Sequence, residues 1–342
     1  MDILTATGAQ LDAGYSNVHR WLEFQFRQMT RDQVEVSLVM RDAVKRLHAR
    51  PVLLKEALSV LTSTRASAIL SAFLDALTRG GPNGLPRPIE IHAHDPTRYV
   101  GDMLAWVHQA TASEHELLDS LFGVRANRMV GEARSAEKSE DEKMVAEVLD
   151  KNLEGLGRPL KLRIEQTVRS QEGIIMTYKI VNLVQFYLVT MRKTIGAEST
   201  LCKTLQEYVH VHPPNYADIR LYDYADAAFF ETLEAQGRSL LRFLHPPDAN
   251  LSPPLALRDA TQVLREIIAV YDTSLVDADE RETDFAKLLN AAVDPAVEMC
   301  ERMADLRRTN TGSWDKDVFL VNCLEYLEVS AAIVSIPHPA RR

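Results

Sequence analysis

The sequence predicts an all-α protein, and three observations support this fold class. Apolar residues recur at three- and four-residue steps through most of the 342 residues, the spacing that places them on one face of a helix. Prolines and glycines divide these stretches into blocks of helical length, as expected for neighbouring helices in a bundle. The alternating pattern of a half-buried strand forms no convincing run, and no repeat of fixed period indicates a solenoid.

Composition limits the class of protein further. The hydrophobic content of 46% supports a sizeable core, and the net charge of -9 argues against general nucleic-acid binding, which needs a concentrated basic surface. Cys202, Cys300 and Cys323 are too few and too far apart for a disulfide framework or a paired-cysteine metal site, which fits a reducing compartment. The first residues lack a secretory signal pattern, and no apolar run is expected to cross a bilayer.

The first eighty residues, 1–80, are expected to form an N-terminal helical bundle. Helices are predicted over residues 3–29, 34–48 and 51–77, the last interrupted near residues 63–65. The first helix has no clear N-cap, and the chain opens within its helical pattern, as expected for a piece of a longer protein.

A proline- and glycine-rich connector over residues 81–96 leads into a long predicted amphipathic helix, residues 96–122. Asp95 followed by Pro96 is typical of an N-cap with proline at the first helical position. The apolar stripe of this helix runs for about seven turns and must be buried against other helices. We expect Tyr99 and Trp106 to flank that stripe and anchor its packing.

The remaining chain is predicted to form a central bundle, residues 97–212, and a C-terminal bundle, residues 213–342. The central bundle includes a flexible, solvated charged loop at about residues 125–143, a bend or a break at Gly155, Gly157 and Pro159, and a helix capped by Ser199. Further helices are expected over residues 144–154, 160–168, 174–195, 199–210, 217–244, 255–271, 280–307 and 314–336. Pro295 is expected to kink or split the helix in which it lies.

The sharpest candidate for chemistry is the group His92, His94 and Asp95, with His108 and His115 downstream. Two imidazoles with a carboxylate could hold a divalent metal. Because the group opens a helix, the sequence favours the interpretation in which Asp95 caps and the histidines bond to loop carbonyls.

Other chemical signals are weaker. His210 and His212 repeat the spacing of the first two histidines without a nearby carboxylate cluster, and Gly155 with Gly157 lacks the strand and third glycine of a dinucleotide site. No nucleophile elbow, Walker loop or H-E-x-x-H motif is present. We therefore assign no catalytic, cofactor-binding or metal-binding residue. Positive charge that could touch acidic partners or anionic lipid, or form a solvated helix face, is carried by Arg158, Lys161, Arg163, Arg169, Arg341 and Arg342.

Several unusual words in the sequence carry a resemblance to a known family. They include TRGGPNG at residues 78–84, PRPIE at 86–90, HDPTRYVGDMLAW at 94–106 and HQATASE at 108–114. With GYSNVHRW near the start and DFAKLLNAAVDPAVEMC near the end, the chain resembles the sixth subunit of the conserved oligomeric Golgi (COG) complex over nearly its whole length.

The resemblance implies tandem helical bundles forming an elongated rod, as in multisubunit tethering complexes. It implies a non-catalytic structural subunit acting in intra-Golgi retrograde transport, without a cofactor, at the cytosolic face of the Golgi membrane. The implied partners are other COG subunits, SNAREs and Rab-type GTPases, with peripheral membrane association through them and no nucleic acid. By the same resemblance, the N-terminal coiled coil and the C-terminal end of the family lie outside this chain.

Two alternatives stay open at this point. The first is a helical metal-dependent hydrolase using His92, His94 and Asp95. The second is a subunit of a related tether such as exocyst, which would share the fold and differ in its partners. Which residues bind a partner cannot be read from the sequence, because an exposed apolar groove and a core-facing ridge have the same pattern.

Overall fold

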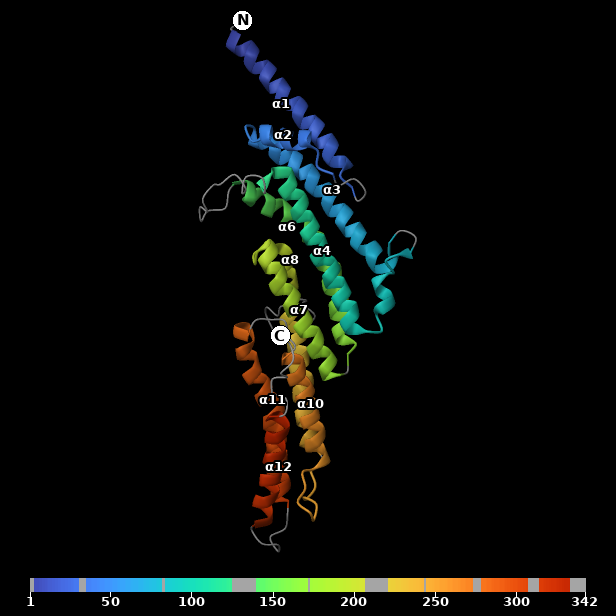
Figure 1. The fold of residues 1–342 in the computed structure, drawn as a ribbon, viewed down its shortest axis with the longest axis vertical. Helices are drawn as coiled ribbons and strands as arrows, with labels where there is room; N and C mark the ends of the chain where they lie inside the picture. The colour runs from blue at the N-terminus through green and yellow to red at the C-terminus, as the bar shows by residue number, and fades with distance from the viewer. Residues whose placement is uncertain are drawn as a thin grey trace, which may run out of the picture. The chain divides into compact units, whose positions relative to one another are not determined.

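The structure is a computed structural model in which eleven α-helices and no strand are found within the described residues, so the all-α prediction is confirmed. The chain divides into two compact units (Figure 1). Unit 1 contains Met1–Ile164 and Tyr187–Leu221, and unit 2 contains Glu165–Phe186 and Tyr222–Arg342. The structure describes residues 3–30, 35–81, 84–124, 140–171, 173–206, 221–242, 244–272, 278–306 and 314–332.

Unit 1 is built around α1 (Ile3–Gln28), α2 (Leu38–Leu47), α3 (Pro51–Thr78) and α4 (Pro96–Phe122). Helix α3 packs against α1, α2 and α4, and α2 packs against α1 and α4 (Figure 1). Large apolar side chains from all four helices are fully buried between them, among them Leu22, Phe26, Leu47, Leu61, Phe73, Leu104 and Leu118. Removing such side chains from water is the main favourable term that holds the bundle together.

Helix ends follow local sequence signals. The Asp95 carboxylate accepts a hydrogen bond from the Arg98 backbone N–H at 3.2 Å, and Pro96 is the first residue of α4, as predicted. Gly123 ends α4 in the left-handed conformation, with φ of 69°. Ser199 caps α8 (Thr200–Gln206) through a 3.2 Å bond from the Cys202 N–H, which confirms that predicted cap.

The connector after α3 folds back on itself. The Gly81 N–H donates to the Pro86 carbonyl at 2.8 Å. Gly80 has φ of +79°, and a Cβ placed there would lie 2.4 Å from the same carbonyl oxygen, so only glycine fits. The turn then enters the short 3-10 helix η2 (Ile89–His92), which packs against α3 and α4.

The predicted breaks in two helices do not occur. Helix α3 runs unbroken through residues 63–65, and α6 (Glu140–Arg169) runs unbroken through Gly155, Gly157 and Pro159. A Cβ on Gly157 would lie 2.8 Å from Thr204 Cγ2, so this glycine permits close approach of α6 and α8. Residues 140–143, expected in the charged loop, form the acidic first turn of α6, where carboxylates interact favourably with the helix dipole. The rest of that loop, residues 125–139, lies outside the described residues.

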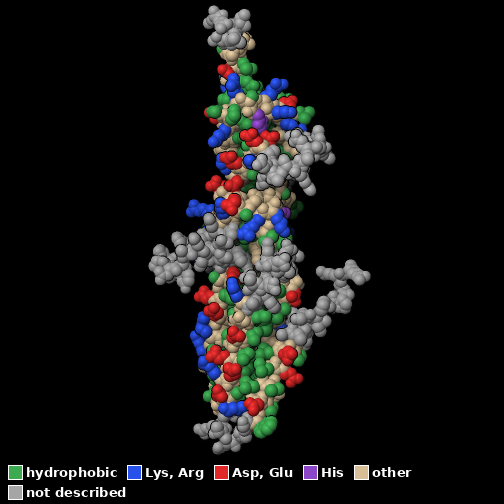
Figure 2. Space-filling model, turned by 90° about the vertical axis from the view of Figure 1, so that its left-hand side faces the viewer, with side chains coloured by type: hydrophobic (Ala, Val, Ile, Leu, Met, Phe, Trp, Pro, Cys, Tyr) green, Lys and Arg blue, Asp and Glu red, His purple; other side chains and the backbone are tan. Residues whose placement is uncertain are grey.

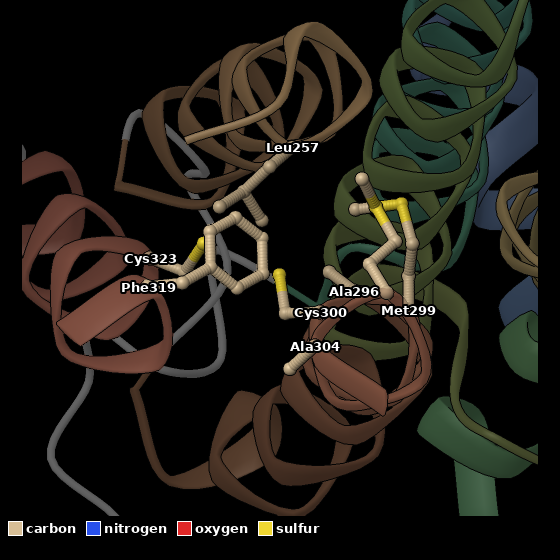
Figure 3. Packing of buried hydrophobic residues seen from close by; sticks show 8 residues of the cluster. Leu257, Ala296, Met299, Cys300, Ala304, Phe319 and Cys323 are labelled. Atoms are coloured by element: carbon tan, nitrogen blue, oxygen red, sulfur yellow. The ribbon is translucent and has the colours of Figure 1, made fainter. Parts of the chain in front are cut away.

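One hydrophobic cluster of unit 2 lies between three helices. They are α10 (Leu255–Asp272), α11 (Ala278–Asp305) and α12 (Trp314–Ala332), and α12 packs against both others. Figure 3 shows Leu257 of α10 meeting Cys300 of α11 and Phe319 of α12, all at most 2% exposed. Met299, Met303, Ala296, Ala304 and Cys323 complete this cluster.

Proline does not divide α11. Pro295 lies inside the continuous helix, so the expected split does not occur. On α9 (Leu221–Leu240), a Cβ at Gly237 would lie 2.8 Å from the Pro295 ring, so the missing side chain leaves room for that ring. The helix is therefore supported at its weakest point by close packing.

By length and composition alone, two helices could cross a membrane, contrary to the expectation from the sequence. They are α3 and α7 (Ile174–Ile195). Core helices of bundles pass the same test, and α3 buries Leu54, Leu58, Leu61, Ile69, Phe73 and Leu77. Its apolar character therefore has an explanation within unit 1.

The two glycines of α6 give opposite predictions. Gly157→Ala should lower the free energy of unfolding by roughly 1–3 kcal/mol because its Cβ overlaps Thr204. Gly155→Ala should raise it by up to about 1 kcal/mol, because its Cβ would meet Leu70 at an ordinary 3.7 Å and alanine favours helix. Urea unfolding followed by circular dichroism measures both, and equal effects of the two substitutions would contradict the proposed close approach.

Candidate functional site

The least expected group in unit 1 is a buried cluster of charged and polar side chains. Arg65 of α3 forms a two-point ion pair with Glu114 of α4, in which Arg65 Nη2 binds Glu114 Oε1 and Arg65 Nε donates to Oε2 at 3.2 Å. The two side chains are only 7% and 4% exposed. Asn152 of α6 donates to the same Oε2 at 3.3 Å. The cluster thus joins three helices through one carboxylate.

Arg65 also holds the end of α1. Its Nη1 donates to the backbone carbonyls of Met29 and Thr30, both at 3.0 Å. Removing one partner from such a group is costly because it leaves a charge or polar atom buried without compensation. The arrangement can position four helices.

Sequence reasoning missed this cluster. A signal was present, because Arg65 continues the four-residue series of Leu61, Ile69 and Phe73, all of which are buried. Glu114 likewise lies on the buried stripe of α4. A charge in the middle of an apolar stripe on each of two helices is a signature of a buried pair.

The structure separates the candidate metal ligands into capping and local roles. His94 Nδ1 bonds to the Ile91 carbonyl at 3.0 Å, and the Asp95 carboxylate is engaged at the helix start. The rings of His92 and His94 have centroids 6.3 Å apart. Within the described part of the chain, no group of three His, Cys, Asp or Glu side chains could hold a metal ion. The hydrolase alternative has no assembled site there.

The other candidate residues are dispersed. His115 pairs with Asp119 one turn away at 3.4 Å, and the His108 ring lies against Tyr187 with centroids 6.2 Å apart. Arg163 forms an ion pair with Glu90 of η2 at 2.7 Å, so part of the predicted positive patch serves internal packing. His210, His212, Arg341 and Arg342 lie outside the described residues.

An open groove of ≈ 400 Å³ lies between α3 and α6 in unit 1. Its lining includes the apolar residues Leu54, Leu58 and Val148 together with charged side chains. There Lys151 donates to Glu147 at 2.7 Å, and this hydrogen bond lowers the pKa of the Glu147 carboxyl. The groove therefore combines apolar and charged side chains in one lining.

The cysteines are buried free thiols. In unit 2, the hydrogen bond with Cys323 and burial raise the pKa of Cys300. In unit 1, burial raises the pKa of Cys202. The hydrogen bond with Cys300 lowers the pKa of Cys323, whose side chain is fully buried in the core. Because a reagent must reach a thiol before the thiol can react, we expect all three buried thiols to be chemically inert in the folded protein.

The fold and these sites define a class of protein, the all-α helical bundles. A buried ion pair links helices of unit 1, and a groove lies open on its surface. The family model described as Conserved Oligomeric Golgi complex subunit 6, C-terminal, matches residues 1–336. The chain belongs to this family, as its sequence motifs indicated.

Curated relatives are similar over almost the whole chain. Conserved oligomeric Golgi complex subunit 6 of Cryptococcus neoformans var. neoformans serotype D is 62% identical over 334 residues, covering 96% of this chain and 43% of that protein. The Homo sapiens subunit is 36% identical, covering 97% and 47%, and the Arabidopsis thaliana subunit is 36% identical, covering 90% and 44%. The chain therefore spans less than half the length of these relatives. No solved structure matches the chain.

The buried pair predicts a large asymmetry between substitutions. Arg65→Ala should lower the free energy of unfolding by about 3–5 kcal/mol because Glu114 is left buried and unpaired. The double variant Arg65→Met with Glu114→Leu should recover much of that loss. As a control, Arg302→Ala removes an exposed pair with Glu298 and should cost at most about 1 kcal/mol. Chemical denaturation measures all three, and similar costs for Arg65→Ala and Arg302→Ala would contradict the assignment.

Thiol chemistry provides an independent check of the two cores. We expect Cys202, Cys300 and Cys323 to react with maleimide in the native protein far more slowly than in denaturant, because each is at most 2% exposed. Mass spectrometry of the labelled protein counts the modified thiols. Rapid native labelling of any of the three would show that its core is open.

Proposed function

We propose that this chain acts as a non-catalytic structural component of a Golgi vesicle-tethering complex in retrograde transport within the Golgi. The observation that carries the proposal is the sequence identity of 62% and 36% to Golgi complex subunits over almost the whole chain. The helical architecture supports it, because packed helices present stable surfaces for partner helices. Membership in the sixth-subunit family favours this assembly over a related tether such as exocyst.

In this proposal the chain works by presenting docking surfaces. Its partners are other subunits of the complex, together with SNAREs and Rab-type GTPases at the cytosolic face of the Golgi. Several weak contacts on one scaffold reinforce each other, because the first contact raises the effective concentration for the next. Membrane association then follows from the partners.

The proposal is tested by copurification from cells. A tagged full-length subunit containing this chain should recover the other complex subunits in a fixed ratio. The same subunit carrying Arg65→Ala should recover fewer, because the surfaces depend on the packing of unit 1. A wild-type subunit that recovers none of the other subunits would contradict the structural role.

Metal analysis tests the hydrolase alternative directly. We expect the purified chain to carry no stoichiometric ion, because the Asp95 carboxylate is engaged as a cap. His92→Ala and His94→Ala should leave the metal content unchanged. A tightly held ion at one per chain that is lost in both variants would favour the enzyme.

A further inference from the structure

Helix α12 has apolar side chains on two opposite sides. On the inner side, Phe319 and Cys323 are fully buried against α10 and α11 (Figure 3). On the outer side, Trp314 is 80% exposed and Val321 is 59% exposed. Figure 2 shows hydrophobic side chains gathered along one face of unit 2. We call the exposed apolar residues of the helix the outer stripe: Trp314, Val318, Val321, Leu324 and Val329.

The outer stripe has the spacing of a helix-packing seam. Trp314, Val318 and Val321 follow each other at steps of four and three, and Glu325 and Glu328 continue the same steps. This face of α12 therefore carries apolar side chains in its first half, and in its second half it carries two carboxylates beside Leu324 and Val329. A helix lying along this face would meet apolar side chains at one end and carboxylates at the other.

The acidic half has no internal compensation. Glu325 and Glu328 are exposed and form no ion pair with any residue that the structure describes. The lysine of α12, Lys316, pairs instead with Asp305 of α11 at 3.2 Å. The surface thus favours a partner that brings positive charge.

Other occupants of this surface fit poorly. An anionic membrane surface attracts basic helices and repels this carboxylate-rich face. A second copy of α12 would set Glu325 and Glu328 against the same carboxylates in a parallel pair, or against the apolar half in an antiparallel pair. Both arrangements cost free energy, through repulsion or through desolvation of charge.

We propose that the outer stripe docks a basic amphipathic helix of another subunit of the same complex. The partner helix is about four turns long, with apolar residues opposite Trp314, Val318 and Val321. Lys or Arg side chains lie opposite Glu325 and Glu328. The inference rests on the proposed function, because it draws the partner from that assembly.

Cysteine footprinting on the full-length subunit tests the proposal. The three cysteines of this chain are buried, so Val321→Cys adds an exposed thiol on the outer stripe. Its maleimide labelling should slow at least about tenfold when the isolated subunit is assembled into the complex, because the docked helix covers it. As a matched control, Glu231→Cys on exposed α9 surface should label at the same rate in both states.

Charge reversal then tests the chemistry of the partner. Adding Glu325→Lys and Glu328→Lys to the Val321→Cys subunit should restore rapid labelling in the complex. Equal labelling of Val321→Cys before and after assembly overturns the inference while leaving the proposed function intact, since the complex has formed. If labelling of Val321→Cys in the complex stays slow after both glutamates are replaced by lysine, the partner helix is not basic. Two results would show that the outer stripe binds something other than a partner subunit. Labelling of the isolated Val321→Cys subunit would slow as its concentration rises, which indicates a second copy, or it would slow when phosphatidylserine vesicles are added, which indicates a membrane.

Discussion

The pairing of Arg65 with Glu114 is the constraint on which the packing of unit 1 depends. Apolar ridges hold helices together without fixing how far one slides along the next, since many registers bury similar areas. A buried charge with one partner removes that freedom, because displacement by one turn leaves both ions unpaired in a poorly solvated interior. Asn152 and the carbonyls of Met29 and Thr30 extend the constraint to α6 and to the end of α1.

Small residues provide a second constraint, through shape. Gly157 allows α6 to approach Thr204 of α8 in unit 1, and Gly237 allows α9 to approach Pro295 of α11 in unit 2. In both places a Cβ would enter space already filled, so the contact selects one pair of helices and one register. In each unit, these close contacts select which helices pair and in which register, while most of the core consists of apolar side chains that do not make this choice.

A defined packing of helices matters for function because a docking surface is only as precise as the scaffold below it. The outer stripe of α12 is presented by a helix whose inner side holds Phe319 and Cys323 in the core. Trp314 and Val321 therefore project from a supported element. A preorganised surface loses less entropy on binding, which allows a modest contact to contribute to assembly.

Local signals in the sequence predicted the fold well, and distant contacts were beyond them. Asp95 and Pro96 define the start of α4 through a hydrogen bond three residues away, so the sequence alone locates it. Arg65 pairs with Glu114, which lies 49 residues further along the chain. A charge within an apolar stripe indicates that each side chain is buried with a partner, yet nothing local shows which residue that partner is. For the same reason the sequence predicts a bend or a break at Gly157, because its neighbour Thr204 belongs to a later helix.

The sequence also did not show which side chains lie on the surface. Helix α12 is apolar on both sides, and only its packing on α10 and α11 shows which side remains exposed. The histidines near Asp95 had the composition of a metal site, yet the bond from His94 to the Ile91 carbonyl belongs to a capped turn. The functional prediction came from sequence motifs that resemble a known family. Such motifs indicate the family without showing which residues contact each other or a partner.

Hydrogen exchange by mass spectrometry tests most directly whether the buried pair organises unit 1. The account predicts that Arg65→Met accelerates exchange together in α3, in α4 around Glu114, in α6 around Asn152 and at the end of α1, while α10 to α12 are unchanged. Faster exchange confined to the neighbourhood of residue 65 in α3 would contradict it.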